Sequence, residues 1–236
     1  MVQSDDSIDR HLAATPAEAT HAVQGGLADL ADLERRLAPY FERAEPRRRA
    51  LASLRGLLSP AERKNTWQVA EISGETTPYA FQHVLRRALW DADVVRDALR
   101  RDLLDHLRDP EAVLVIDETG LLKQGPHAAG VARQDRGTAG RVEHGQIGVF
   151  VAYASGHGPG RLDRELSVPK AWTDDPARCQ RAGMPRDRRL ATTPQLARQR
   201  LARAFAAGVP AAWVAGDRVD GDDRRRRRWL ASCPQA

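Results

Sequence analysis

The hydrophobic pattern of the chain changes at Asp109-Pro110. Before this point, leucines and other apolar residues recur every three or four positions, which is the spacing of amphipathic helices. After it, apolar residues gather in short, partly β-branched runs that are typical of strands buried on both faces. The sequence therefore predicts an all-helical region over residues 27–109 and an α/β domain over residues 110–236. The polar residues 1–26, which end in Gly25-Gly26, are expected to form a flexible arm.

Start signals divide the helical region into several helices. We expect helices to begin near Leu27, Pro46, Ser59-Pro60, Thr77-Pro78 and Asp93. At Ser59 and Thr77 the expected device is the same, because a hydroxyl side chain caps the helix and proline fills its first turn.

The second region predicts a small sheet with one long helix. Apolar runs favour strands over residues 112–117, 145–155, 161–168 and 211–217, and a helix is expected to begin at Thr193-Pro194, before the last strand. The order is therefore strand, strand, strand, helix, strand, which indicates the α/β fold class.

Two aspartates end the first and last of these strands. Asp117 and Asp217 follow the runs AVLVI and AAWVAG, and an acid at the end of a buried strand is costly unless it is solvated, paired or bound to a cation. On adjacent parallel strands the two carboxylates would repel each other unless a divalent ion compensated them. Oxygen ligands suit Mg²⁺ or Mn²⁺, and such ions support phosphoryl transfer.

A structural role for both aspartates is the alternative. Asp117 could cap a turn through Thr119 and Gly120, and Asp217 could begin an Asx-turn. The chain would then be a structural or adaptor domain without a metal site.

The charge balance is compatible with a nucleic-acid partner. The chain has 37 Lys and Arg against 32 Asp and Glu, a formal net charge of +5, which permits such a partner without demanding one. Basic residues near the two aspartates are candidates for contacts with DNA phosphates, the alternative being a solvated charged face: Lys123, Arg133, Arg136, Arg141, Arg224, Arg225 and Arg226.

Membrane and secretion signals are not evident in the sequence. No apolar run approaches the roughly 20 residues that cross a bilayer, and the first residues lack the apolar centre of a secretory signal. Cys179 and Cys233 are too few for a disulfide framework. We expect a cytoplasmic, nucleoid-associated protein without a membrane partner.

Several blocks of the chain resemble insertion-element transposases of the DDE class, a group labelled DDE superfamily endonuclease. The blocks are VLVIDETGLLK, RGTAGRVEHGQIGVFVAYAS, DRELSVPKAWTDDPARC and WVAGDRVDGDD, and LLSPAERKNTWQVAE and TTPYAFQHVLRRALWDADVVRDALR resemble the helical leader of the same family. The resemblance implies an RNase H-like core in which Asp117 and Asp217 are the first two catalytic, metal-binding aspartates. It further implies a Mg²⁺-dependent (or Mn²⁺-dependent) nuclease that nicks DNA at element ends and uses the freed 3′-hydroxyl for strand transfer. The helical region would then help to bind DNA.

The chain departs from the family pattern after Asp217. The third metal ligand of the family is a glutamate on a helix well downstream, and residues 218–236 contain no glutamate. The resemblance therefore predicts a C-terminally truncated transposase with an incomplete RNase H-like mixed sheet, catalytically incomplete by itself. The alternative is a non-catalytic DNA-binding relic or a truncated inhibitor of transposition. Whether the chain forms a homo-oligomer stays open.

Overall fold

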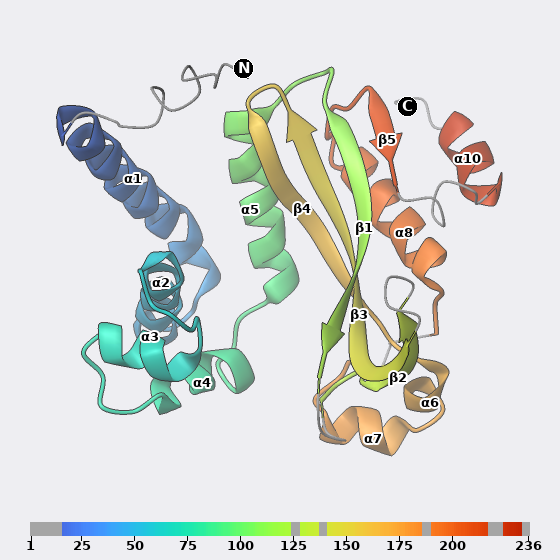
Figure 1. Ribbon diagram of the computed structural model, residues 1–236, viewed down its shortest axis with the longest axis horizontal. Helices are drawn as coiled ribbons and strands as arrows, with labels where there is room; N and C mark the ends of the chain where they lie inside the picture. The colour runs from blue at the N-terminus through green and yellow to red at the C-terminus, as the bar shows by residue number, and fades with distance from the viewer. Residues whose placement is uncertain (1–15, 124–127, 137–140, 186–189, 217–223, 233–236) are drawn as a thin grey trace, which may run out of the picture. The chain divides into compact units, whose positions relative to one another are not determined.

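The computed structural model describes residues 16–123, 128–136, 141–185, 190–216 and 224–232 of the chain (Figure 1). The chain divides into two compact units, Met1–Ala98 and Leu99–Ala236. The division falls within helix α5 (Ala92–Leu107) rather than at Asp109-Pro110. The reason is that Leu103, Leu104 and Leu107, near the end of α5, pack into the core of the second unit.

The described part of the first unit is helical, as its leucine spacing predicts. Its elements are α1 (Pro16–Leu37), the 3-10 helix η2 (Ala38–Tyr40), α2 (Ala44–Leu58), α3 (Thr66–Ile72), α4 (Tyr79–Arg86) and the first half of α5.

Helix α1 begins earlier than expected. It starts at Pro16 rather than at Leu27, so the expected arm over residues 1–26 is helical from Pro16 onward, and residues 1–15 lie outside the described part. Proline suits a first helical turn, and the alanines and glutamate that follow are good helix formers. The pair Gly25-Gly26 weakens the helix but does not end it.

Helix α3 begins later than expected. Ser59 ends α2 instead of starting the next helix, because its backbone N–H and its hydroxyl both donate to the Gly56 carbonyl. The N-cap of α3 is Asn65, whose side-chain oxygen accepts hydrogen bonds from the backbone N–H groups of Trp67 and Gln68, both at 3.0 Å. Two residues with capping chemistry thus lie close together, and Asn65 is the one that caps the helix.

Helices α2, α3 and α4 pack around a small shared core. Val69 and Ala70 of α3 are buried with Phe81 of α4 and contact Ala52 of α2. At Gly56 the first two helices approach so closely that an added Cβ would lie 2.8 Å from Cγ1 of Val69. This glycine therefore sets the spacing between α2 and α3.

The second unit is built on a mixed five-stranded sheet (Figure 1). Strand β3 (Arg141–Ser155) pairs antiparallel with β1 (Val113–Leu122), β2 (Ala132–Arg136) and β4 (Gly158–Ser167), and β5 (Trp213–Ala215) pairs parallel with β1. The described helices of this unit, besides the end of α5, are α6 (Lys170–Thr173), α7 (Pro176–Arg181), α8 (Thr193–Ala206) and α10 (Arg224–Ala231). The expected α/β class is confirmed, and the central order β4-β3-β1-β5 agrees with an RNase H-like sheet.

Strand lengths differ from those expected. Strand β1 continues to Leu122, because β3 pairs with it over its whole length, whereas β5 pairs with it only over residues 113–115. Strand β2 lies between the first two expected strands, where no strand was expected, because its polar residues give no apolar signal.

One face of the sheet carries the main core. Leu114, Ile116, Val149, Val151 and Tyr153 are buried there, together with the apolar side of α8: Leu196, Ala197, Leu201 and Ala204. Helix α8 begins with a capping box between Thr192 and Gln195. It is also tied to β4 by ion pairs, Arg200 with Glu165 at 3.0 Å and Arg203 with Asp163 at 3.9 Å. We call the opposite side of the sheet the open face.

None of the helices in the described ranges combines the length and the apolar character that a membrane crossing requires.

Candidate functional site

Asp117 lies inside strand β1 and not at its carboxyl end. It is the fifth residue of a strand that continues to Leu122, and its side chain is exposed. The expectation that the strand ends at Asp117 was wrong, because a polar residue ends an apolar run without ending the pairing with β3. Asp117 instead stands just past the point where the shorter neighbour β5 stops pairing.

The Asp117 carboxylate has one hydrogen bond that the structure specifies. The Thr119 hydroxyl donates to Oδ2 at 3.1 Å. Both residues are in extended strand conformation, so Asp117 does not cap a turn through Thr119 and Gly120. The alternative that treats this aspartate as a turn cap is therefore wrong. The bond steadies the carboxylate and leaves Oδ1 available to other ligands.

Asp217 lies outside the described residues, and its strand can be followed only to Ala215. Over that strand, the parallel register joins Val113 to Trp213, Leu114 to Val214 and Val115 to Ala215. Each pair is separated by 100 positions, which is also the separation of Asp117 and Asp217 in the sequence.

Asp117 shares the open face with an aromatic and two arginine side chains. Its direct partner on β3 is Phe150, whose partner on β4 is Arg164. Direct partners on neighbouring strands point to the same side of a sheet, and the flanking Val149 and Val151 point into the core. The Arg161 guanidinium lies over the Phe150 ring, 4.4 Å from its centroid.

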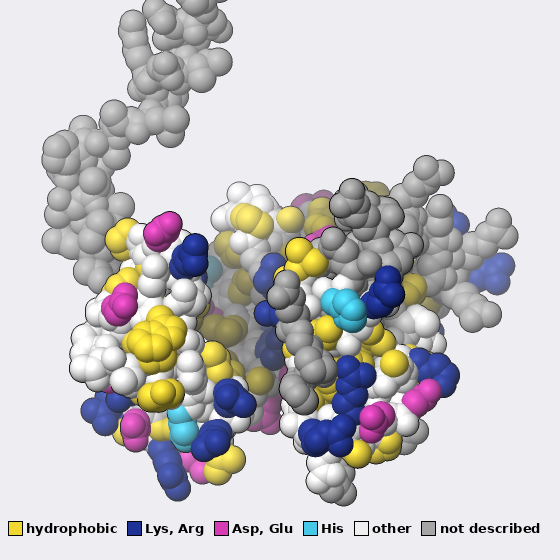
Figure 2. All heavy atoms as spheres, turned by 60° about the horizontal axis from the view of Figure 1, so that its bottom comes forward, with side chains coloured by type: hydrophobic (Ala, Val, Ile, Leu, Met, Phe, Trp, Pro, Cys, Tyr) yellow, Lys and Arg dark blue, Asp and Glu magenta, His cyan; other side chains and the backbone are white. Residues whose placement is uncertain are grey.

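Two of the candidate phosphate-binding residues form a row at the far end of this face. Lys123 donates its backbone N–H to the His144 carbonyl at 3.3 Å, and Arg133 of β2 is paired with His144 on the other side. All three side chains are exposed. The row lies six positions along β1 from Asp117, or about 20 Å at the rise of an extended strand. Figure 2 shows Lys and Arg side chains around this end of the sheet.

The remaining basic candidates are only partly described. Arg136 ends β2, Arg141 begins β3, and Arg224, Arg225 and Arg226 begin α10. Their side chains lie outside the described parts, so the structure brings only Lys123 and Arg133 together.

The part of the chain that the structure describes contains no preformed metal site. Within that part, three or more His, Cys, Asp or Glu side chains never gather closely enough to hold an ion. A metal held by Asp117 would need ligands from the undescribed segments, from water or from a substrate.

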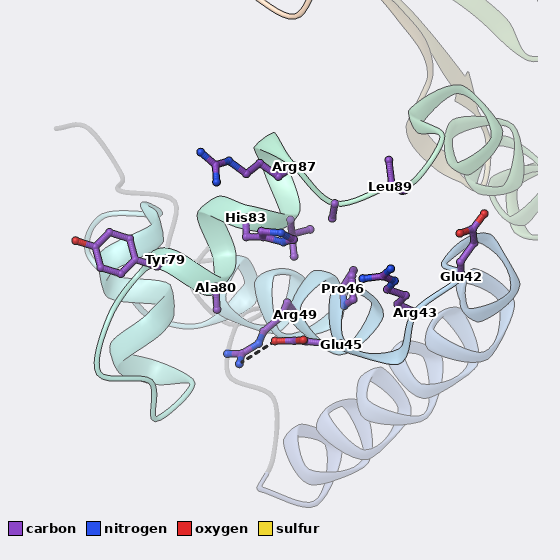
Figure 3. A pocket seen from close by; sticks show the side chains of 12 residues that line it. Glu42, Arg43, Glu45, Pro46, Arg49, Tyr79, Ala80, His83, Arg87 and Leu89 are labelled. Carbon is purple, nitrogen blue, oxygen red and sulfur yellow. Dashed lines mark ion pairs between the residues drawn. The ribbon is translucent and has the colours of Figure 1, made fainter.

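The helical unit carries a surface groove between α2 and α4 (Figure 3). Its volume is about 470 Å³, and Arg43, Arg49, Tyr79, His83 and Arg87 are among the side chains that line it. Arg49 is engaged by Glu45 at 4.0 Å and by Glu75. Arg43, His83 and Arg87 are exposed, and the groove combines these basic side chains with Glu42 and with apolar residues such as Leu89.

Sequence reasoning missed Phe150 and Arg161 as neighbours of Asp117. Each belongs to a correctly predicted strand, but their proximity depends on the pairing of three strands. The useful signal was the alternation around Phe150, which assigns it to the side opposite Val149 and Val151.

The comparisons with known proteins settle the family. The model of the DDE superfamily endonuclease family matches residues 36–232. The chain belongs to this family. The match includes most of the helical unit and the sheet of the second unit, so the resemblance seen in separate sequence blocks extends over both units.

A curated relative of the chain is named "Probable transposase for insertion sequence element IS701", from Microchaete diplosiphon. It is 31% identical over 96 residues, which are 41% of this chain and 25% of the relative. The matched part of the chain thus spans about a quarter of the relative's length.

Proposed function

We propose that the chain is part of an insertion-element transposase that cleaves DNA and transfers strands with Mg²⁺ or Mn²⁺ held by Asp117 and Asp217. The observation that carries the proposal is the parallel pairing of Val115 with Ala215. Each aspartate follows a member of this pair by two residues. Parallel strands run in the same direction from such a pair, so residues at equal steps beyond it leave at the same edge of the pairing.

The chemistry of Asp117 fits a hard divalent ion. Its carboxylate is exposed on the open face and is oriented through one oxygen by Thr119. Mg²⁺ and Mn²⁺ prefer oxygen ligands, and members of this family generally use divalent metal ions. When bound, such an ion polarises a phosphodiester and stabilises the attacking and leaving oxygens. Asp117 would hold the ion, and Thr119 would keep the carboxylate in place.

The basic residues of the second unit would hold the DNA backbone. Lys123 and Arg133 share one face of the sheet with Asp117 and are exposed. Salt-dependent phosphate contacts of this kind dominate non-specific DNA affinity. We extend the role to Arg136, Arg141 and the arginines that begin α10: Arg224, Arg225 and Arg226. A DNA substrate would keep the protein with the nucleoid.

The helical unit would contribute to binding of the element ends. Phe81 and Val84 bury one side of α4, while Tyr79, His83 and Arg86 are exposed on it. An exposed helix face with aromatic and basic side chains suits contact with duplex DNA.

The family resemblance calls for a third carboxylate ligand besides Asp117 and Asp217. Residues 218–236 contain no glutamate to serve as a third ligand. A second candidate function is binding of DNA without cleavage, in competition with active transposase subunits, and the exposed basic side chains of Lys123 and Arg133 favour it.

Metal binding and nicking test the proposal together. Mn²⁺ titration followed by calorimetry should show binding that is lost in both Asp117→Asn and Asp217→Asn, with Asp174→Asn, an exposed acid on another segment, as the control. Low nicking of a supercoiled plasmid with Mg²⁺ should disappear in the same two variants. Unchanged Mn²⁺ binding in both would overturn the site. DNA protection without any nicking, equal in Asp117→Asn and wild type, would favour the binding-only function.

A further inference from the structure

We propose that Arg161 and Phe150 form a phosphate-binding subsite beside Asp117, which holds a flanking phosphodiester of the DNA strand presented to that aspartate. This inference rests on the proposed function, since it assumes a DNA strand on the open face. Arg161 is assigned here as a positioning residue that orients the strand and takes no part in bond breaking.

The strand pairing brings the subsite next to Asp117. Arg161 of β4 is the partner of Ala152 on β3, and Ala152 is the partner of Val115 on β1. Val115 is in turn the partner of Ala215. Arg161 thus lies two positions along the strands from the row of Asp117 and two strands across, which is roughly 10 Å between strand axes.

A β-bulge explains how Arg161 comes to point to this side. The register of β3 and β4 shifts between Val151 and Ala152, so that Asp163 pairs with Val151 and Arg161 with Ala152. Leu162 is the extra residue, and it is buried in the core. The bulge lets Leu162 and Asp163 both lie buried while Arg161 remains exposed on the open face.

The Phe150 ring holds the Arg161 guanidinium in one place. The guanidinium carbon is 4.4 Å from the ring centroid. The ring itself lies close over Gly148, where an added Cβ would be 2.8 Å from a ring carbon. Because Gly148 has no side chain, the Phe150 ring can lie close to the sheet. The Arg161 guanidinium then packs on the other face of the ring.

A stacked arginine remains able to bind phosphate. The planar guanidinium stacks through its face, and its N–H donors point outward from its edge in the fork that matches phosphate oxygens. No acidic residue of the described ranges forms an ion pair with Arg161, and its side chain is exposed. Pre-ordering by Phe150 lowers the entropy lost when the phosphate binds.

The salt dependence of binding to duplex DNA distinguishes two roles of Arg161: binding a phosphate, or only stacking on the Phe150 ring. The affinity of the full chain for a fluorescent duplex oligonucleotide is measured by anisotropy across a NaCl series. In Arg161→Ala we expect the slope of log affinity against log salt to become shallower by about 0.9, the value of one phosphate contact. Phe150→Leu should weaken binding with a smaller change in slope, because the charge remains but is no longer held.

Arg161→Lys and Arg198→Ala complete the design. Arg161→Lys keeps the charge and should keep the slope while binding more weakly, because the fork and the stack are lost. Arg198→Ala removes an exposed arginine of α8, the helix on the core side, and should match wild type. Thermal unfolding checks that each variant is folded. If Arg161→Ala keeps the wild-type slope, the subsite is wrong while the proposed function stands. If wild type does not bind DNA, the proposed function fails and the subsite fails with it.

Discussion

The Tyr153 hydroxyl holds both backbone groups of Asp109. It accepts a hydrogen bond from the Asp109 N–H at 2.9 Å and donates one to the Asp109 carbonyl at 2.8 Å. Tyr153 is fully buried in β3, and Asp109 lies in the connection between α5 and β1. One side chain therefore fixes the point at which the helical pattern gives way to the sheet.

Tyr153→Phe should destabilise the second unit by about 1–2 kcal/mol, because two backbone groups lose their partner while the ring stays in place. Urea unfolding followed by circular dichroism measures the change. Tyr79→Phe is the control, since Tyr79 is 72% exposed. Equal unfolding midpoints for the two variants would show that the two hydrogen bonds contribute nothing.

Asp109 should make the stability of this unit sensitive to acid. The backbone N–H of Glu111, at 2.8 Å, and that of Gly156, at 3.2 Å, donate to its carboxylate and lower its pKa from the usual 3.8, with a further contribution from His157. The ionised form therefore stabilises the fold above pH 3.8, and this is lost as the pH falls through the lower pKa of the folded state.

Asp109→Asn should accordingly lower the melting temperature at neutral pH and flatten its decline as the pH falls below about 3.8. Glu111→Gln is the matched control, because it removes a nearby exposed acid and keeps the donating backbone N–H. An identical pH profile for Asp109→Asn and wild type would contradict the assignment.

Gly56→Ala should destabilise the helical unit although alanine is the better helix former. The gain in helix propensity is about 1 kcal/mol, but the new methyl group would lie 2.8 and 2.9 Å from the two Cγ atoms of Val69. Val69 is β-branched and buried, so it cannot turn away at low cost. We expect a net loss of about 1–2 kcal/mol.

The double variant Gly56→Ala/Val69→Ala checks this packing argument. Its loss of unfolding free energy should be smaller than the sum of the losses in the two single variants, because the clash disappears. Simple additivity in thermal unfolding would mean that the contact does not limit the spacing of α2 and α3.

Removing one partner of the ion pair between Arg200 and Glu165 should destabilise the fold more than replacing both partners. The pair joins α8 to β4 at 3.0 Å, and Glu165 is only 9% exposed. Glu165→Ala would leave the guanidinium without its carboxylate, at a cost of about 3 kcal/mol. Replacing both residues with methionine should recover most of that loss in urea unfolding. A double variant as unstable as the single would indicate that packing, rather than charge, is at stake.

Lys123 and Arg133 should contribute two phosphate contacts. The variant Lys123→Ala/Arg133→Ala is expected to reduce the salt slope of duplex binding by about 1.8, at 0.9 for each contact. Both side chains are exposed, so the melting temperature should not change. A wild-type slope would show that DNA does not reach the row of Lys123, His144 and Arg133.

Local patterns predict the elements of this chain better than their ends. The leucine spacing predicts the helices and the apolar runs predict four of the strands, because both signals lie within a few residues. The choice between Ser59 and Asn65 as a cap, and the continuation of β1 past Asp117, depend on partners distant in sequence. The stack of Arg161 on Phe150 further requires the bulge at Leu162, for which the pattern gives no sign.

Only part of the candidate site could be predicted from the sequence, for the same reason. Asp117 stands out because it interrupts an apolar run, and Asp217 because it does so 100 residues later. That β1 and β5 pair at this offset is a property of the folded sheet. Arg161 and Phe150 carry no motif and become visible only in three dimensions.

The long interval between β1 and β5 also sets an order of events on the ribosome. Strands β1, β3 and β4 are antiparallel neighbours and are complete once Ser167 has emerged, whereas β5 is made some 46 residues later. A nascent chain can thus build most of its sheet while the partner of Val115 is still untranslated. Any site that needs residues of both β1 and β5 can therefore form only after residue 215 has been translated.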